Sequence, residues 1–113
     1  MALKPKVYFL EYVLAANQVL TKTFSISNDY DWTMMMMTHA KTADAEIQNL
    51  KVADEDMLEV PTRIDLICGN TARLLPLPQP LFVPRKSTVT CKVADKSGAG
   101  NTVVVAFIGV KKV

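Results

Sequence analysis

Residues 88–110 read TVTCKVADKSGAGNTVVVAFIGV and carry the clearest structural pattern in the chain. The stretch begins with alternating polar and apolar residues, which predicts a strand with one buried face. The residues expected to point inward are Val89, Cys91 and Val93. Residues 96–101, KSGAGN, are typical of a turn. The nearly unbroken apolar run of residues 102–110 predicts a strand covered on both faces, by a core and by another sheet or subunit. We expect the two strands to form a hairpin.

The same alternation marks an earlier segment, residues 20–27. One face of this segment is mostly apolar and the other carries hydroxyl groups, as expected for a half-buried strand. The residues of the mostly apolar face are Leu20, Lys22, Phe24 and Ile26. Residues 28–31, NDYD, are typical of a turn, and residues 32–39 follow as a second extended segment. We therefore expect a hairpin or a corner here.

The middle of the chain gives weaker signals. Residues 46–52 are expected to form a strand, and the acidic residues 53–56 are expected to form a turn. A short helical turn near residues 57–60 would end at Pro61. A further short strand is expected over residues 64–68. Short extended segments and turns therefore alternate through this region.

Four prolines interrupt residues 76–84. Proline lacks a backbone N–H group, so it is not expected in a central strand or in the interior of a helix. We expect this segment to cross the surface as a stiff, extended connection. The four residues are Pro76, Pro78, Pro80 and Pro84.

The composition agrees with β-structure. Val, Ile and Thr, whose branched side chains suit a pleated sheet, supply 28 of the 113 residues. The chain, residues 1–113, is expected to be a single all-β domain: an antiparallel β-sandwich, jelly-roll-like, with about seven or eight short strands. A chain of this length can bury a core without metal or disulfide support. Cys68 and Cys91 are therefore expected to be buried thiols.

Charge and hydropathy argue against two classes of partner. The net charge is only +2 and the basic residues are scattered, so nucleic-acid binding is not expected. The longest strongly apolar run has eight residues, residues 103–110, against roughly twenty for a membrane-spanning helix. No secretory signal is visible at the start. We expect a protein made in the cytosol, without a membrane partner.

The run Met34-Met35-Met36-Met37 with His39 is the most conspicuous motif, because thioethers and imidazole can bind Cu(I). In a regular strand, Met35, Met37 and His39 would share one face, with the other two methionines on the opposite face. Methionine more often fills core or interface space. The run therefore favours a strand buried on both sides, and no metal site is expected.

Other candidate catalytic groups are incomplete. The turn Gly98-Ala99-Gly100 lacks the third glycine and the helix of a phosphate-binding loop. A nucleophilic pair of Cys68 or Cys91 with His39 has no activating surroundings, and His39 as a general base has no second residue. The acidic residues around the predicted turn lack calcium-loop order. They are Asp54, Glu55, Asp56 and Glu59. We expect a protein without enzymatic activity or cofactor.

The N-terminal segment, residues 1–15, is amphipathic in an extended conformation. One face carries Tyr8, Leu10, Tyr12 and Leu14. The other face carries Val7, Phe9, Glu11 and Val13. Small proteins seldom leave such apolar area in water. Either the segment is an interface arm whose second face is covered by another chain, or both faces are core in a monomer.

Five stretches resemble the small jelly-roll structural proteins of tailed bacteriophages. They are ANQVL (16–20), FSISNDYDW (24–32), PLFVPRKSTV (80–89), KSGAGNTV (96–103) and FIGVK (107–111). The chain is most similar to the capsid decoration proteins, also called cement or staple proteins, of short-tailed phages. The Met34–Met37 run and the acidic residues 53–56 have no counterpart in this resemblance.

The resemblance implies a virion protein, made in the cytoplasm of the bacterial host. Such a protein binds the outer surface of an icosahedral shell, often as a homodimer or other homo-oligomer, and clamps neighbouring subunits of the major capsid protein. Aromatic residues and Arg are enriched where interfaces are strongest. The candidate contact residues are Tyr8, Phe9, Tyr12, Leu81, Phe82 and Arg85. Core packing is the alternative for each of them.

A second function class remains open. Jelly rolls also bind sugars, so the chain could be a glycan- or host-binding module of a phage tail or adhesion apparatus. Sugar sites commonly stack a ring on an exposed aromatic side chain. Tyr30 and Trp32, beside Asp29 and Asp31, are the group that this alternative would use.

Overall fold

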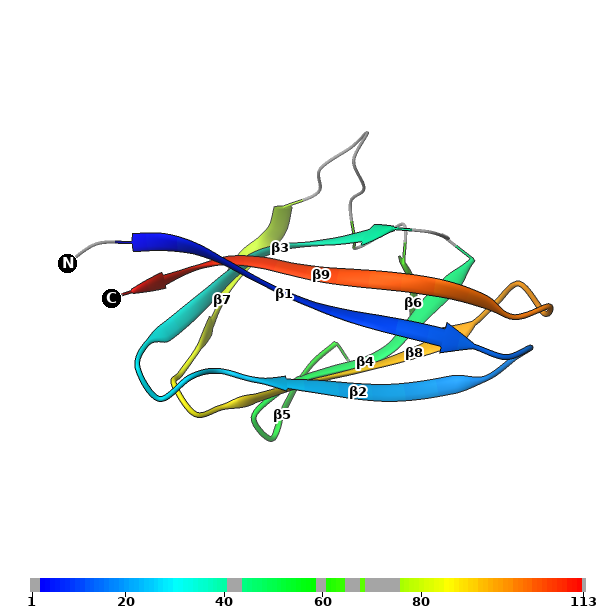
Figure 1. Cartoon of the computed structure of the whole chain (residues 1–113), viewed down its shortest axis with the longest axis horizontal. Coiled ribbons are helices and arrows are strands. Elements are labelled where there is room, and N and C mark those ends of the chain that lie inside the picture. Colours follow the sequence, from blue (N-terminus) through cyan, green and yellow to red (C-terminus); the bar gives the residue numbers. More distant parts are fainter. Residues whose placement is uncertain (1–2, 41–43, 59–60, 65–67, 69–75, 113) are drawn as a thin grey trace.

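The structure is a computed structural model that describes residues 3–40, 44–58, 61–64, 68 and 76–112. These residues form nine strands in two antiparallel sheets stacked face to face (Figure 1). The predicted all-β sandwich is confirmed. The strand count exceeds the expected seven or eight because two short strands pair along one neighbour in the second sheet.

The first sheet has four strands, in the order β1-β9-β3-β7. Their bounds are β1 Leu3–Leu14, β9 Asn101–Lys112, β3 Asp31–Ala40 and β7 Pro76–Val83. The second sheet has the order β2-β8-β4-β5, with β6 also paired to β4. Their bounds are β2 Val19–Ser25, β8 Thr88–Asp95, β4 Ala45–Val52, β5 Glu55–Leu58 and β6 Thr62–Arg63. Strands β1 and β7 are the edges of the first sheet.

Strands that follow one another in the chain mostly lie in opposite sheets, which is a jelly-roll topology. The expected hairpin between residues 88–95 and 101–112 is therefore wrong, because β8 and β9 belong to different sheets. Both strands bury apolar side chains, Val93 on β8 and Val105 on β9 among them, and these faces meet across one core. The turn between β2 and β3 is likewise a corner between the sheets.

An aromatic cluster fills the core near one end. The Tyr8 and Phe24 rings stack with centroids 4.6 Å apart, and Phe107 lies 5.0 Å from Phe24. Trp32 meets the Tyr8 ring edge-on at 5.1 Å. Burial of each such side chain contributes about 1.5–3 kcal/mol, before packing geometry is counted. The strand alternation predicted for residues 20–27 thus supplies Phe24 to the centre of this cluster.

The middle of the chain follows the prediction only in part. The expected strand over residues 46–52 is confirmed as β4, and a tight turn at Ala53, with φ of 55°, leads directly into β5. The expected helical turn is wrong for Met57 and Leu58, which belong to β5 because Leu58 pairs with β4. Residues 59–60, including Glu59 of the acidic group, lie outside the described residues.

The strand expected over residues 64–68 is not formed at its two described ends. The amide of Cys68 donates a hydrogen bond to the carbonyl oxygen of Ile64 at 2.8 Å, which is the spacing of a helical turn. Residues 65–67 lie outside the described residues. Cys68 is placed against the core by this turn.

The proline-rich segment is an edge strand. As expected, it is extended and not central, because β7 pairs only with β3. An edge position tolerates residues that lack an N–H group, since one side of the strand has no ladder to complete. The segment is therefore part of the first sheet and not a connection across its surface.

Asp95 joins two chain reversals at one end of the sandwich. Its carboxylate accepts hydrogen bonds from the amides of Asn17 (2.9 Å), Ser97 (2.9 Å) and Gly100 (3.2 Å). The Ser97 hydroxyl donates a further bond at 2.7 Å. These donors hold the pKa of Asp95 well below its usual range. The turn after β1 and the loop between β8 and β9 are thereby fixed to one carboxylate.

Candidate functional site

The outer face of the first sheet is largely apolar. Register places Val7 opposite Ile108 and Ile108 opposite Met36, so one apolar row crosses β1, β9 and β3 without a break. We call the following set the outer apolar face: Leu3, Val7, Phe9, Val13, Val104, Ala106, Ile108, Val110, Met36 and Phe82. Residues 102–110 are expected to be covered on both faces. In the structure the face with Val103, Val105 and Phe107 is buried in the core, and the opposite face is part of this surface.

Several side chains of this face are strongly exposed. Phe9 is 70% exposed, Leu3 66%, Val13 64% and Phe82 61%. The outward-facing apolar side chains of β9 are half-buried, since β9 has β1 on one side and β3 on the other. A contiguous apolar surface of this kind on a small protein usually marks an interaction site.

Charged residues lie only toward the ends of this face, among its described positions. Glu11 on β1 is level with Val104, and Lys112 is the last residue of β9. Asp31 pairs with Lys112 in register, but its carboxylate already accepts hydrogen bonds from Arg85. A carboxylate and an ammonium therefore mark opposite ends of an apolar surface.

The methionine run does not alternate as predicted. The register of β3 shifts between Met34 and Met36, so the strand contains a bulge. Met34 and Met37 are both buried, while Met35 is 39% exposed. The expected grouping of Met35 with Met37 and His39 is therefore wrong. In the described part of the chain, no group of His, Cys, Asp or Glu residues is arranged to hold a metal ion.

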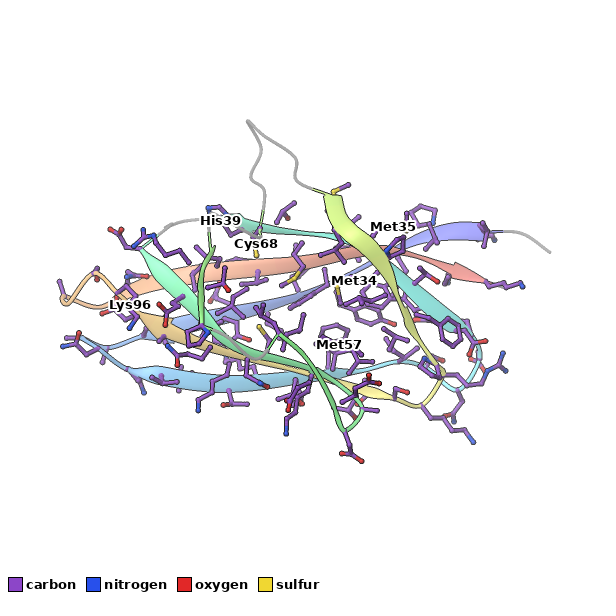
Figure 2. All side chains as sticks on the ribbon, turned by 180° about the vertical axis from the view of Figure 1, so that it is seen from behind. Met34, Met35, His39, Met57, Cys68 and Lys96 are labelled. Carbon is purple, nitrogen blue, oxygen red and sulfur yellow. The ribbon has the colours of Figure 1, made fainter. Side chains whose placement is uncertain are left out.

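His39 and the two cysteines do not form a nucleophilic site in this structure. His39 lies beside Cys68 (Figure 2), but its Nδ1 atom is 3.1 Å from the backbone carbonyl oxygen, not from the thiol. Cys68 and Cys91 are free and buried, as predicted. Burial raises the pKa of the Cys91 thiol to about 11 and also raises the pKa of Cys68. Both thiols are therefore protonated at neutral pH.

Two of the six candidate contact residues lie inside the sandwich. Tyr12 is fully buried and donates a hydrogen bond to the Cys91 carbonyl oxygen at 2.8 Å. Tyr8 stacks on Phe24, and its hydroxyl is hydrogen-bonded to that of Tyr30. The proposal that Tyr8 and Tyr12 contact a partner is corrected, because their face of β1 closes the core.

Of the other four candidates, Phe9, Phe82 and Arg85 lie at the surface, whereas Leu81 also faces the core, so its expected partner contact is corrected as well. Phe9 and Phe82 belong to the outer apolar face, on the two edge strands. Leu81 points the other way and packs against the core. Arg85 is exposed, and its Nε donates to Asp31 Oδ1 at 3.2 Å. Hydrogen bonds from the Arg85 amide and guanidinium lower the pKa of the Asp31 carboxyl.

The aromatic group proposed for sugar stacking is not available at the surface. Trp32 is fully buried, and its Nε1 donates to the Lys6 carbonyl oxygen at 3.0 Å. Tyr30 is partly buried, with the Lys111 ammonium 5.0 Å from its ring centroid. The predicted location of a sugar site is therefore wrong.

A polar depression of about 500 Å³ lies on the outer face of the second sheet. The residues lining it are Thr21, Gln48, Asn49, Lys51, Asp56, Thr90 and Lys92. At its rim, Asn49 Nδ2 donates to Asp56 Oδ1 at 3.1 Å. No sequence pattern indicates this site, because its residues come from four strands that pair only in the folded sheet.

Comparison with known proteins found no match among family models, curated proteins or solved structures. No helix of the described residues has the length and hydropathy needed to span a membrane. The likeness to phage decoration proteins thus remains a resemblance of short motifs.

Proposed function

We propose that this protein is a structural component of a phage virion, which binds the outside of an icosahedral capsid and clamps neighbouring subunits of the major capsid protein. The observation that carries the proposal is the β7 edge of the first sheet, where Phe82 and Arg85 are exposed. A rigid sandwich with an exposed aromatic residue and an Arg at one edge is suited to binding another protein surface, and many copies on one shell would gain from avidity.

The β7 edge carries residues suited to a protein contact. Phe82 lies on β7, at the edge of the first sheet opposite to Phe9 on β1. Arg85 follows β7, and its side chain is 52% exposed. Aromatic residues and Arg are the types that most often carry binding energy. We assign the β7 edge, with Phe82 and Arg85, to the shell contact.

A non-catalytic role is supported by the condition of the reactive groups. The buried thiols are protonated, and His39 is engaged by a backbone carbonyl. Both observations are compatible with a function that is carried by the surfaces of the protein.

The proposal is tested by gradient sedimentation of a lysate that contains the assembled particles. We expect the protein to sediment with capsid-sized particles, in many copies per particle. Phe82→Asp should move it to the top of the gradient. Val19→Asp is the matched control, because Val19 is an exposed apolar residue of the second sheet, and it should leave sedimentation unchanged. Recovery of the wild-type protein only at the top would overturn the proposal.

A glycan- or host-binding module is the second candidate, now with a different site. The polar depression offers amide, hydroxyl and charged groups to a hydroxylated ligand. A glycan array would test it, with Asn49→Ala and Lys92→Ala as variants that should lose a wild-type signal. Wild-type binding that both variants retain would exclude the depression.

A further inference from the structure

We infer that a second copy of this chain covers the outer apolar face on β1, β9 and β3, with the two first sheets packed face to face and the two β9 strands antiparallel. This inference goes beyond the shell contact, which we assign to the β7 edge. Its centre is Ile108, the middle of the apolar row on β9, which lies between Val7 on β1 and Met36 on β3.

The size of the face fits a small dimer interface. Three strands, β1, β9 and β3, about 4.8 Å apart and about ten residues long at 3.3 Å per residue, give roughly 480 Å² per copy. Two such faces would bury roughly 950 Å², the size of the smaller and weaker protein interfaces. Sheets that pack in this way interlock their inner side chains as in a sandwich core.

Charge placement selects a second copy and one orientation. On β9, Ile108 lies midway between Val104, which is level with Glu11, and Lys112. A two-fold axis through Ile108, perpendicular to the strands, therefore brings Glu11 of each copy level with Lys112 of the other. β1 and β9 are neighbouring strands, about 4.8 Å apart, so the two side chains can meet. The surface is self-complementary, as a two-fold interface requires.

The alternative two-fold arrangement lacks this match. If the axis ran along the strands, Glu11 would face the part of the partner's sheet that carries Val104 and Ala40, where it would be an unpaired carboxylate against apolar groups. Burying such a charge is costly. The antiparallel stack also places Phe9 over the level of Pro5 in the second copy, so that two exposed apolar side chains cover each other.

The stack leaves the β7 edge at the margin. Phe82 pairs with Thr33, which pairs with Val110, so Phe82 is level with Val110. The two-fold axis places the Val110 level of one copy over the Ala106 level of the other. The described pairing of β7 with β3 ends at Met36, level with Ile108. Phe82 and Arg85 are therefore placed beside the dimer contact, where the shell contact was assigned.

Sedimentation velocity of the purified protein tests the inference. We expect a particle of twice the 12.5 kDa chain mass. Glu11→Lys and Lys112→Glu should each weaken dimerisation about tenfold at low salt, and the double exchange should restore it. Glu55→Lys is the control, because Glu55 is exposed on the second sheet. Ile108→Asp should abolish the dimer, and the charge exchanges keep the test decisive if that variant does not fold.

The outcomes separate this inference from the proposed function. A wild-type monomer across the micromolar range overturns the dimer, and so does a double exchange that fails to restore it. If that monomer still sediments with particles, the shell contact stands without the dimer. A dimer that remains at the top of the gradient supports the present inference and overturns the virion role.

Discussion

Trp32 occupies the space that a side chain at Gly109 would need. A Cβ atom added to Gly109 would lie 2.7 Å from Trp32 Cε2 and Nε1, and 2.2 Å from the Thr33 carbonyl oxygen. Because β9 lies between β3 and β1, the indole crosses the middle strand at Gly109 to reach the Lys6 carbonyl oxygen. One glycine thus allows one side chain to link three strands.

Gly109→Ala is therefore expected to destabilise the protein by about 2–3 kcal/mol, as for overpacking of a core. Urea unfolding followed by Trp32 fluorescence would measure it. Gly98→Ala is the control, because a Cβ there meets nothing within 4 Å and only the positive φ of 77° opposes it. That variant should lose about 1 kcal/mol. Equal losses in the two variants would contradict the crossing.

Because of Asp95, the protein should become less stable at acidic pH. The pKa of Asp95 is lowered in the folded state, so the native carboxylate binds protons less readily than the unfolded one. The contribution of Asp95 to the free energy of unfolding should stay constant above its unfolded pKa of about 3.9. It should fall as the pH drops below that value. Urea midpoints between about pH 2 and 6 would show this fall. Asp95→Asn should be less stable at neutral pH and less acid-sensitive. Asp54→Asn, in an exposed turn, should match the wild type in both respects.

Phe9 and Tyr12, three residues apart on one strand, should respond oppositely to the same change. Tyr12→Asp places a carboxylate in a fully buried position and should cost at least about 4 kcal/mol, or prevent folding. Phe9→Asp should keep a folded protein, with a loss within about 1 kcal/mol when monomers are compared. Circular dichroism melts at low protein concentration would separate them. A Phe9→Asp variant as unstable as Tyr12→Asp would place Phe9 in the core.

Both cysteines should resist alkylation in the native state. The pKa of Cys91 is raised to about 11, and burial also raises that of Cys68, so little thiolate exists at pH 8 and neither sulfur is accessible. Mass spectrometry after iodoacetamide treatment should find no adduct without denaturant and two adducts in urea. Rapid native labelling of either residue would show that its part of the core opens.

Local alternation in the sequence carried the prediction of strands and of their buried faces. It placed Phe24 and Cys91 correctly on inward faces, because a half-buried strand has a period of two. It could not tell a hairpin from a corner, since both join two alternating strands by a polar turn. The pairing of β8 with β2 and β4 depends on residues far away in the chain.

Of two other features, the sequence pattern did not show one and showed the other only in part. Residues 34–37 are all methionine, so no polar residue among them shows which positions face outward. The bulge in β3 could therefore not be predicted. The outer apolar face was foreseen on residues 102–110 and on Phe9, but its continuity with Met36 and Phe82 depends on strand order. Both depend on which strands become neighbours, which alternation within a single strand does not determine.

The central position of β9 governs when the first sheet can form. Residues 101–112 lie between β1 and β3, so β1 has no ladder partner and β3 can pair only with β7 until nearly the whole described chain has been made. Until then β1 and β3 expose unpaired edges and apolar side chains, a state prone to aggregation. Contacts between the two ends of a chain also slow folding. The first sheet is therefore complete only when β9 has been made.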